Sequence, residues 1–92
     1  MFITNGNGQV VGFQPPNEES ITAAKLPFIH ENPNKSGEEQ PFIIHCITGG
    51  DVTFEAWGGQ THTRTMIAGE NYMTLARQVT AIPNDTSFSA LY

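Results

Sequence analysis

Cysteine is almost absent from this chain of 92 residues: Cys46 stands alone, so no disulfide can form within the chain. A domain of this length buries only about 60–65% of the surface that its unfolded chain exposes, which leaves a marginal core. Small domains compensate with disulfides, a metal or a partner chain. The length allows one domain, and we expect it to gain stability from oligomerisation or from docking onto a larger structure.

Positive charge is scarce as well. Four Lys and Arg residues stand against nine Asp and Glu residues, a formal net charge of −5. Nucleic-acid binding draws most of its affinity from neutralised phosphates, so this chain is not expected to bind DNA or RNA. Long apolar runs are also missing: nothing approaches the ~20 residues that cross a bilayer, and the N-terminus lacks the pattern of a signal peptide. We expect no membrane partner and synthesis in a reducing cytoplasm.

Only 14% of the residues are charged, whereas Thr, Gly, Asn and β-branched residues are plentiful, a composition typical of strands joined by tight turns. Strand-like segments follow one another at intervals of about 8–12 residues, as in sandwiches and barrels. The sequence therefore predicts an all-β fold, a small antiparallel β-sandwich or jelly-roll-like barrel with at most one short helical turn. The clearest predicted strands are Phe42–Thr48, Val52–Trp57, Thr61–Ile67, Tyr72–Ile82 and Ser87–Tyr92.

Alternation assigns faces within two of these strands. In Val52–Trp57, one face is predicted to hold Val52, Phe54 and Ala56. In Tyr72–Ile82, one face is predicted to hold Met73, Leu75, Val79 and Ala81, and Arg77 interrupts it.

The first 16 residues are predicted to form an N-terminal arm or hairpin. An Asn/Gly-rich turn at Asn5–Gly8 separates Phe2–Thr4 from Gln9–Phe13, and Asn-Gly supplies the positive φ of hairpin turns. Gly6, Gly8 and Gly12 superficially match a dinucleotide fingerprint. They precede a strand rather than a helix, so no cradle of amides exists for a pyrophosphate, and we interpret them as turn residues.

Residues 17–92 are predicted to form a single β domain. Asn17 is suited to cap a short helix that carries Glu18 and Glu19 in its first turn and ends before Pro27. Residues 30–41 are polar and rich in Pro and Gly, which predicts an exposed loop. We expect this loop and residues 1–16 to contact other chains, because neither can form a core alone.

Residue types suited to chemistry are present, but their spacing is unfavourable. His30, His45 and His62 lack the close pairing of metal ligands, and adjacent His45 and Cys46 point to opposite faces of a strand. Cys46 is flanked by aliphatic residues, which indicates a buried, inert thiol. The sequence therefore predicts no catalytic residues, no metal ligands and no cofactor.

Two further groups have structural or binding interpretations. Glu55 and Arg64 are predicted to approach each other across the Gly58-Gly59-Gln60 turn as a cross-strand ion pair. The aromatic residues Trp57, Tyr72 and Tyr92 suit either a sugar-stacking platform or core and interface anchors.

Several stretches of the C-terminal half resemble a family of very small phage virion proteins, which includes spike-base proteins of gene transfer agents and phage head proteins. The segments FIIHCITGGDVTF, MIAGENY, LARQVTAI and NDTSFSALY carry the resemblance. Ala76 departs from the family, in which a proline is usual after the position of Leu75. The matching positions are Gly50-Asp51-Val52, Gly59, Ala68-Gly69, Arg77 with Val79, Thr86, and Ala90-Leu91-Tyr92.

The resemblance implies a non-enzymatic structural protein in the phage head, assembled in the host cytoplasm. Its partners would be the capsid protein and neighbouring copies of itself, as a pentamer or trimer, and a spike or fibre protein at a vertex. It would act as head decoration, cement or spike base. Two alternatives remain: a tail or baseplate adaptor, and a free carbohydrate-binding β module that uses Trp57.

Overall fold

The computed structural model describes residues 2–4, 9–13, 17–31, 35 and 37–92. Within these residues, the chain forms β-strands and one three-residue 3-10 helix, η1 (Ala23–Lys25). The described strands are β1 (Phe2–Thr4), β2 (Val10–Phe13), β3 (Glu18–Ile21), β4 (Phe28–Ile29), β5 (Phe42–Cys46), β6 (Gly50–Ala56), β7 (Thr61–Met66), β8 (Asn71–Ala81) and β9 (Phe88–Leu91).

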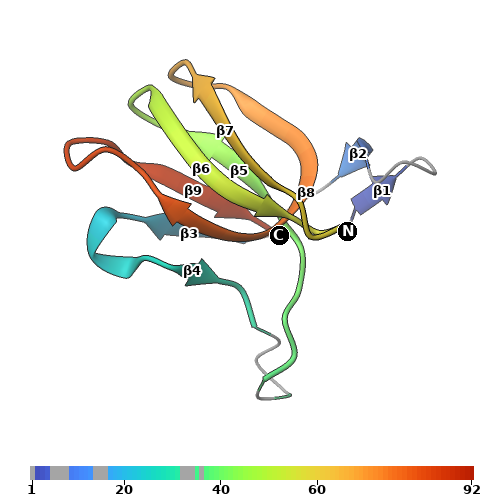
Figure 1. The fold of residues 1–92 in the computed structure, drawn as a ribbon. Helices are drawn as coiled ribbons and strands as arrows, with labels where there is room; N and C mark the ends of the chain where they lie inside the picture. The colour runs from blue at the N-terminus through green and yellow to red at the C-terminus, as the bar shows by residue number, and fades with distance from the viewer. Residues whose placement is uncertain (1, 5–8, 14–16, 32–34, 36) are drawn as a thin grey trace.

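One antiparallel sheet contains seven of these strands, in the order β3-β9-β5-β8-β6-β7, with β4 paired to β8 beside that path (Figure 1). β8 organises the sheet. Its Ala76 is partnered by both Phe42 of β5 and Ala56 of β6, so these two strands lie on opposite edges of β8. The prediction of an all-β antiparallel fold is confirmed. No helix of the described residues is long and apolar enough to cross a membrane.

The core lies inside the curl of this sheet. β5 is buried on both faces, as its nearly continuous apolar sequence predicts. In β6, Val52 and Phe54 are fully buried, whereas Thr53 and Glu55 on the other face are partly exposed, which confirms the predicted alternation. The buried cluster comprises Ile21, Phe28, Phe42, Ile44, Cys46, Val52, Phe54, Met66, Ala76, Val79, Phe88 and Ala90.

The helix predicted to start at Asn17 is wrong. Glu18–Ile21 forms strand β3, which pairs with β9, and only Ala23–Lys25 is helical. The backbone N–H of Asn17 donates to the carbonyl of Tyr92, and that of Tyr92 donates to Asn17, both at 3.1 Å. A strand partner from the other end of the chain therefore overrides a local capping preference, because a ladder that also buries Ile21 satisfies more backbone groups than one turn of helix.

The face predicted for β8 is also wrong. Val79 is buried as expected, but its buried companion is Ala76, while Met73 and Leu75 are half-buried and Ala81 is exposed. Two buried residues three positions apart break the period of two. The pairings of β8 with β5 and with β6 both contain register shifts, and a bulge inserts the extra residue that changes the face.

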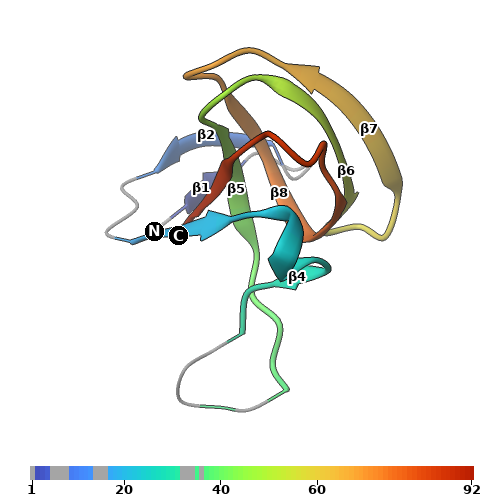
Figure 2. The same ribbon diagram turned by 90° about the vertical axis from the view of Figure 1, so that its left-hand side faces the viewer.

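β1 and β2 pair antiparallel, with Phe2 opposite Phe13, as expected for an N-terminal hairpin. The predicted turn at Asn5–Gly8, with Gly6 and Gly8, lies outside the described residues. Gln9 forms an isolated bridge with Thr74, which ties this hairpin to β8. Figure 2 shows the pair outside the curled sheet, and Figure 1 shows it beside β8.

Candidate functional site

The predicted ion pair between Glu55 and Arg64 does not form, because the register of the β6–β7 hairpin separates them. Glu55 lies opposite Thr61, and Arg64 lies opposite Val52, so the two side chains emerge on opposite faces of the sheet. Arg64 instead bridges Glu70 at 3.3 Å.

The turn explains this register. Ala56 accepts a hydrogen bond from the N–H of Gly59 at 2.8 Å and donates to the carbonyl of Gln60 at 2.7 Å, and Gly59 has φ +97°. This is a three-residue hairpin loop closed by a glycine bulge. It makes Ala56 and Gln60 the closing pair, and every later pairing follows from that one.

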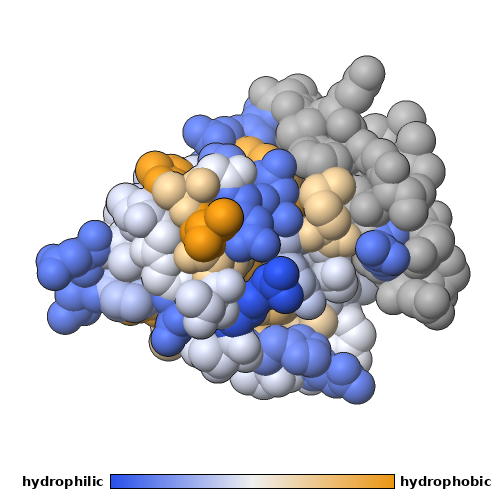
Figure 3. All heavy atoms as spheres, turned by 90° about the horizontal axis from the view of Figure 1, so that it is seen from above, coloured by the Kyte–Doolittle hydropathy of each residue, from blue (hydrophilic) through white to orange (hydrophobic). Residues whose placement is uncertain are grey.

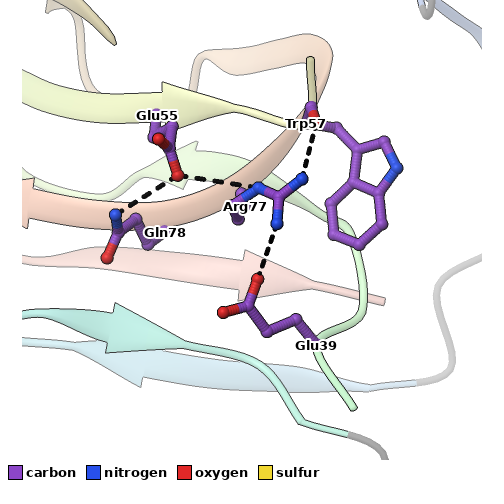
Figure 4. A network of polar contacts seen from close by, with 5 residues as sticks. All are labelled: Glu39, Glu55, Trp57, Arg77 and Gln78. Atoms are coloured by element: carbon purple, nitrogen blue, oxygen red, sulfur yellow. Dashed lines mark hydrogen bonds and ion pairs between the residues drawn. The ribbon is translucent and has the colours of Figure 1, made fainter. Parts of the chain in front are cut away.

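Arg77 is the centre of a polar network at one corner of the sheet (Figure 4). Its guanidinium donates to Glu39 at 2.9 Å and to the carbonyl of Trp57 at 3.0 Å, and its Nε lies 3.6 Å from Glu55. Gln78 donates to the same Glu55 oxygen at 3.3 Å. The network joins β8, the β6–β7 turn and the segment before β5.

The same arginine sets the position of Trp57. Its guanidinium carbon lies 4.7 Å from the centre of the indole ring, within the range of a cation–π contact. Trp57 is 36% exposed and lines a shallow hollow of about 430 Å³, together with Gln60, His62, Leu75 and neighbouring residues. One face of this ring is therefore occupied by the arginine of its own chain.

The three aromatic residues considered for a sugar platform have separate surroundings. Tyr72 packs 4.9 Å from the Phe54 ring and lies beneath Arg64, whereas Tyr92 stacks on His30 with 3.7 Å between ring centres. Trp57 and Tyr92 line two hollows that share no lining residue. The three rings therefore do not form one continuous stacking surface.

The histidines are likewise dispersed. His45 is hydrogen-bonded to Asn71, and His62 is exposed on β7 beside Phe54. The described residues contain no group of three or more His, Cys, Asp or Glu side chains placed to hold a metal ion. Cys46 is fully buried, as expected, and its Sγ accepts a hydrogen bond from the N–H of Gly49 at 3.1 Å.

The cluster around His30 was not expected, because residues 30–41 were predicted to be an exposed loop. His30 is only 9% exposed, and its carbonyl accepts a hydrogen bond from the N–H of Gln40 at 2.8 Å. Tyr92 donates to Glu19 at 3.0 Å beside the same ring. With Glu31, these residues line a hollow of about 580 Å³ at the end of the chain. The residues at 32–34 and 36 lie outside the described part of the loop.

Burial in this cluster shifts two pKa values in opposite directions. Desolvation lowers the pKa of His30 below its usual 6.5, against a weaker opposing effect of Glu19 and of the Gln40 side chain. Desolvation raises the pKa of Tyr92 above 10.0, and the hydrogen bond to Glu19 adds to this rise. Both shifts favour the neutral side chain, since charge is costly away from water.

We predict that stability falls as the pH drops through 6.5, because the unfolded His30 then takes up a proton that the folded residue resists. The urea midpoint should decrease between pH 7.5 and pH 5.5, and the decrease should be smaller in His30→Gln. His62→Gln, which changes an exposed histidine, is the matched control and should keep the wild-type dependence. An unchanged dependence in His30→Gln would assign the effect to other groups.

Above pH 10 the raised pKa of Tyr92 also lowers stability, because the unfolded Tyr92 then loses a proton that the folded residue keeps.

The outer edge of β7 is one end of the sheet. β7 is the last strand in the sheet order. Five of its six residues are exposed, so both faces of the strand are exposed along most of its length. It carries neither proline nor lysine, and no bulge interrupts its pairing with β6, so Arg64 is its one charged residue and most of the usual devices that protect a free edge are missing. The opposite edge differs: Nζ of Lys25 donates to the carbonyl of Ser20 in β3 at 3.1 Å and covers it.

Large apolar side chains are exposed in only a few places among the described residues. Ile47, Trp57 and Ile67 are 44%, 36% and 72% exposed, and each follows the end of a strand. Figure 3 shows separate apolar spots among polar atoms where the β5–β6 and β7–β8 turns are seen from above.

No family model, curated protein or solved structure matches this chain.

Proposed function

We propose that this chain is a non-enzymatic structural protein of a phage virion, attached to the capsid as head decoration or at the base of a vertex spike. The observation that carries the proposal is the outer edge of β7, a regular strand that pairs on that side with no other strand of the described residues. Strand addition at such an edge is a common way for small β modules to join larger assemblies. The resemblance to small phage virion proteins is the reason for proposing a phage head as that assembly.

The positions that carry this resemblance shape the sheet. Gly50 has φ +142°, and a Cβ built on it would lie 2.9 Å from Cγ2 of Thr86, so these two positions pack together at the β5–β6 turn. Gly59 and Gly69 take positive φ in the next two turns, and Ala90 is buried in the core. The resemblance therefore falls on residues that fix a fold, and the role in a virion follows from it as a proposal.

The proposal is tested on virions purified from a host that expresses the chain. We expect the protein to co-sediment with the capsid protein in a density gradient, and to remain with heads when heads and tails are separated. Recovery with tails only would favour the adaptor alternative. Absence from intact particles, with the free protein binding to a glycan array and Trp57→Ala losing that binding, would overturn the proposal in favour of a carbohydrate-binding module.

A further inference from the structure

The register of the β6–β7 hairpin determines which backbone groups of β7 point toward its outer edge. Ala56 and Gln60 form the closing hydrogen-bonded pair. Hydrogen-bonded and non-hydrogen-bonded pairs alternate along an antiparallel ladder. Thr61, Thr63 and Thr65 occupy the non-hydrogen-bonded positions opposite β6, so their N–H and C=O groups point outward along the free edge.

We infer that this edge binds a second copy of the chain, with two β7 strands pairing antiparallel about a two-fold axis at Thr63. In this register Thr63 lies opposite Thr63 of the second copy, and Thr61 opposite its Thr65. All three outward-facing residues of each strand then meet outward-facing residues of the other. Every donor and acceptor that the three threonines present on the edge finds a partner.

Charge selects this register from its neighbours. Centred on Thr63, the pairing places Arg64 opposite His62 of the second copy. A shift of the centre to Arg64 would place two arginines directly opposite each other, which is unfavourable. A shift to His62 would place Thr65 opposite Gly59 in the turn of the second copy and lose part of the ladder.

The exposed apolar residues support the same register. Ile67 directly follows β7 and is 72% exposed. Continued past the end of the strand, the register places Ile67 opposite Gly59 of the second copy, two residues from Trp57. Each end of the paired strands would therefore bring an exposed isoleucine to an exposed tryptophan. Gly59 leaves room there, since a Cβ at that position would have no atom within 4 Å.

The alternative partner strand is β3, the other end of the sheet. A β7–β3 contact would add copies head to tail. The Lys25 side chain already covers the Ser20 carbonyl on that edge, and an edge lysine opposes strand addition. The β7–β7 contact is isologous and closes on two copies. The contact uses the same β7 edge as the proposed function, but it needs no capsid, so the state of the purified chain in solution tests it on its own.

The first test measures the mass of the purified full-length chain over a range of concentrations by analytical ultracentrifugation. Thr63→Pro removes one outward-facing N–H and leaves the bonds to β6 in place, whereas the matched Thr63→Ala keeps that N–H. Both variants lose the hydroxyl contact with Thr53 at 2.9 Å. The wild type and Thr63→Ala should form dimers, and Thr63→Pro should need at least about tenfold more protein.

Dimers of unchanged strength in Thr63→Pro, trimers or pentamers that the substitution leaves intact, or a wild type that stays monomeric at every concentration would overturn the inference. A second measurement holds even if Thr63→Pro fails to fold. Thr63→Cys should be captured as a dimer by a short bis-maleimide, while Asp85→Cys in an exposed turn should not. Cys46 is fully buried and does not compete. Equal capture of the two variants would also overturn the inference.

Discussion

Gly50→Ala is expected to destabilise the protein by about 2–4 kcal/mol, because two independent costs coincide at this position. The backbone has φ +142°, a conformation that side chains rarely adopt. In addition, the new Cβ would lie 2.9 Å from Cγ2 of Thr86, a contact that forces one of them to move. The change in the free energy of unfolding is measured by urea denaturation.

Two further variants separate these costs. Thr86→Ser removes Cγ2 but keeps the hydroxyl that donates to the carbonyl of Pro83 at 2.6 Å. Added to Gly50→Ala, it should therefore relieve the part of the destabilisation that comes from the contact and leave the part that comes from the backbone. Gly58→Ala is the control, since a Cβ there meets no atom within 4 Å, and it should change stability by about 0.5 kcal/mol or less. Equal effects of the two Gly→Ala variants would contradict the packing of Gly50 against Thr86.

Phe54→Ala is expected to destabilise the protein by about 3–5 kcal/mol. Phe54 is fully buried in the middle of β6, and its ring contacts those of Tyr72 and His62, at 4.9 and 5.8 Å between centres. Small domains have a total stability of about 5–15 kcal/mol, so this loss leaves little of the folded state. Thermal unfolding followed by circular dichroism measures it.

Phe54→Leu is the matched control, because it keeps most of the volume and should cost less than about 1.5 kcal/mol. Thr53→Ala, one residue away on the partly exposed face, should cost less still. A melting temperature that is the same in Phe54→Ala and Thr53→Ala would show that the buried face of β6 has been assigned to the wrong residues.

The second half of the fold follows from local sequence because its turns are short. Glycines fix where each strand ends, and Gly49, Gly59 and Gly69 indeed take positive φ. The strands between them have lengths that the sequence predicts to within about two residues. Local chemistry is sufficient here, since neighbouring strands in the chain are joined by tight turns.

Register and faces were less predictable. Whether Glu55 meets Arg64 depends on which residues close the hairpin, and a three-residue loop with a glycine bulge puts them on opposite faces. The buried pair Ala76 and Val79 requires a bulge that depends on both neighbours of β8. A change of one residue reverses every face along a strand, so such errors are large in consequence.

The cluster at His30 depended on contacts far apart in sequence. The sequence predicts a helix at Glu19 and an exposed loop at His30. The pairing of β3 with β9 brings Glu19 beside Tyr92, and His30, which directly follows β4, stacks on the same ring. No local pattern reports that pairing. The edge of β7 is different: its polar, alternating threonines were visible in the sequence, but its place at the end of the sheet was not.

Amide hydrogen exchange at β7 tests edge docking most directly. In dilute protein, the N–H groups of Thr61, Thr63 and Thr65 should exchange quickly, while those of His62 and Arg64, which face β6, are protected. In concentrated protein or in the assembled particle, exchange at the three threonines should slow by about tenfold or more. Exchange rates at these threonines that stay the same in dilute and assembled protein would contradict docking through this edge.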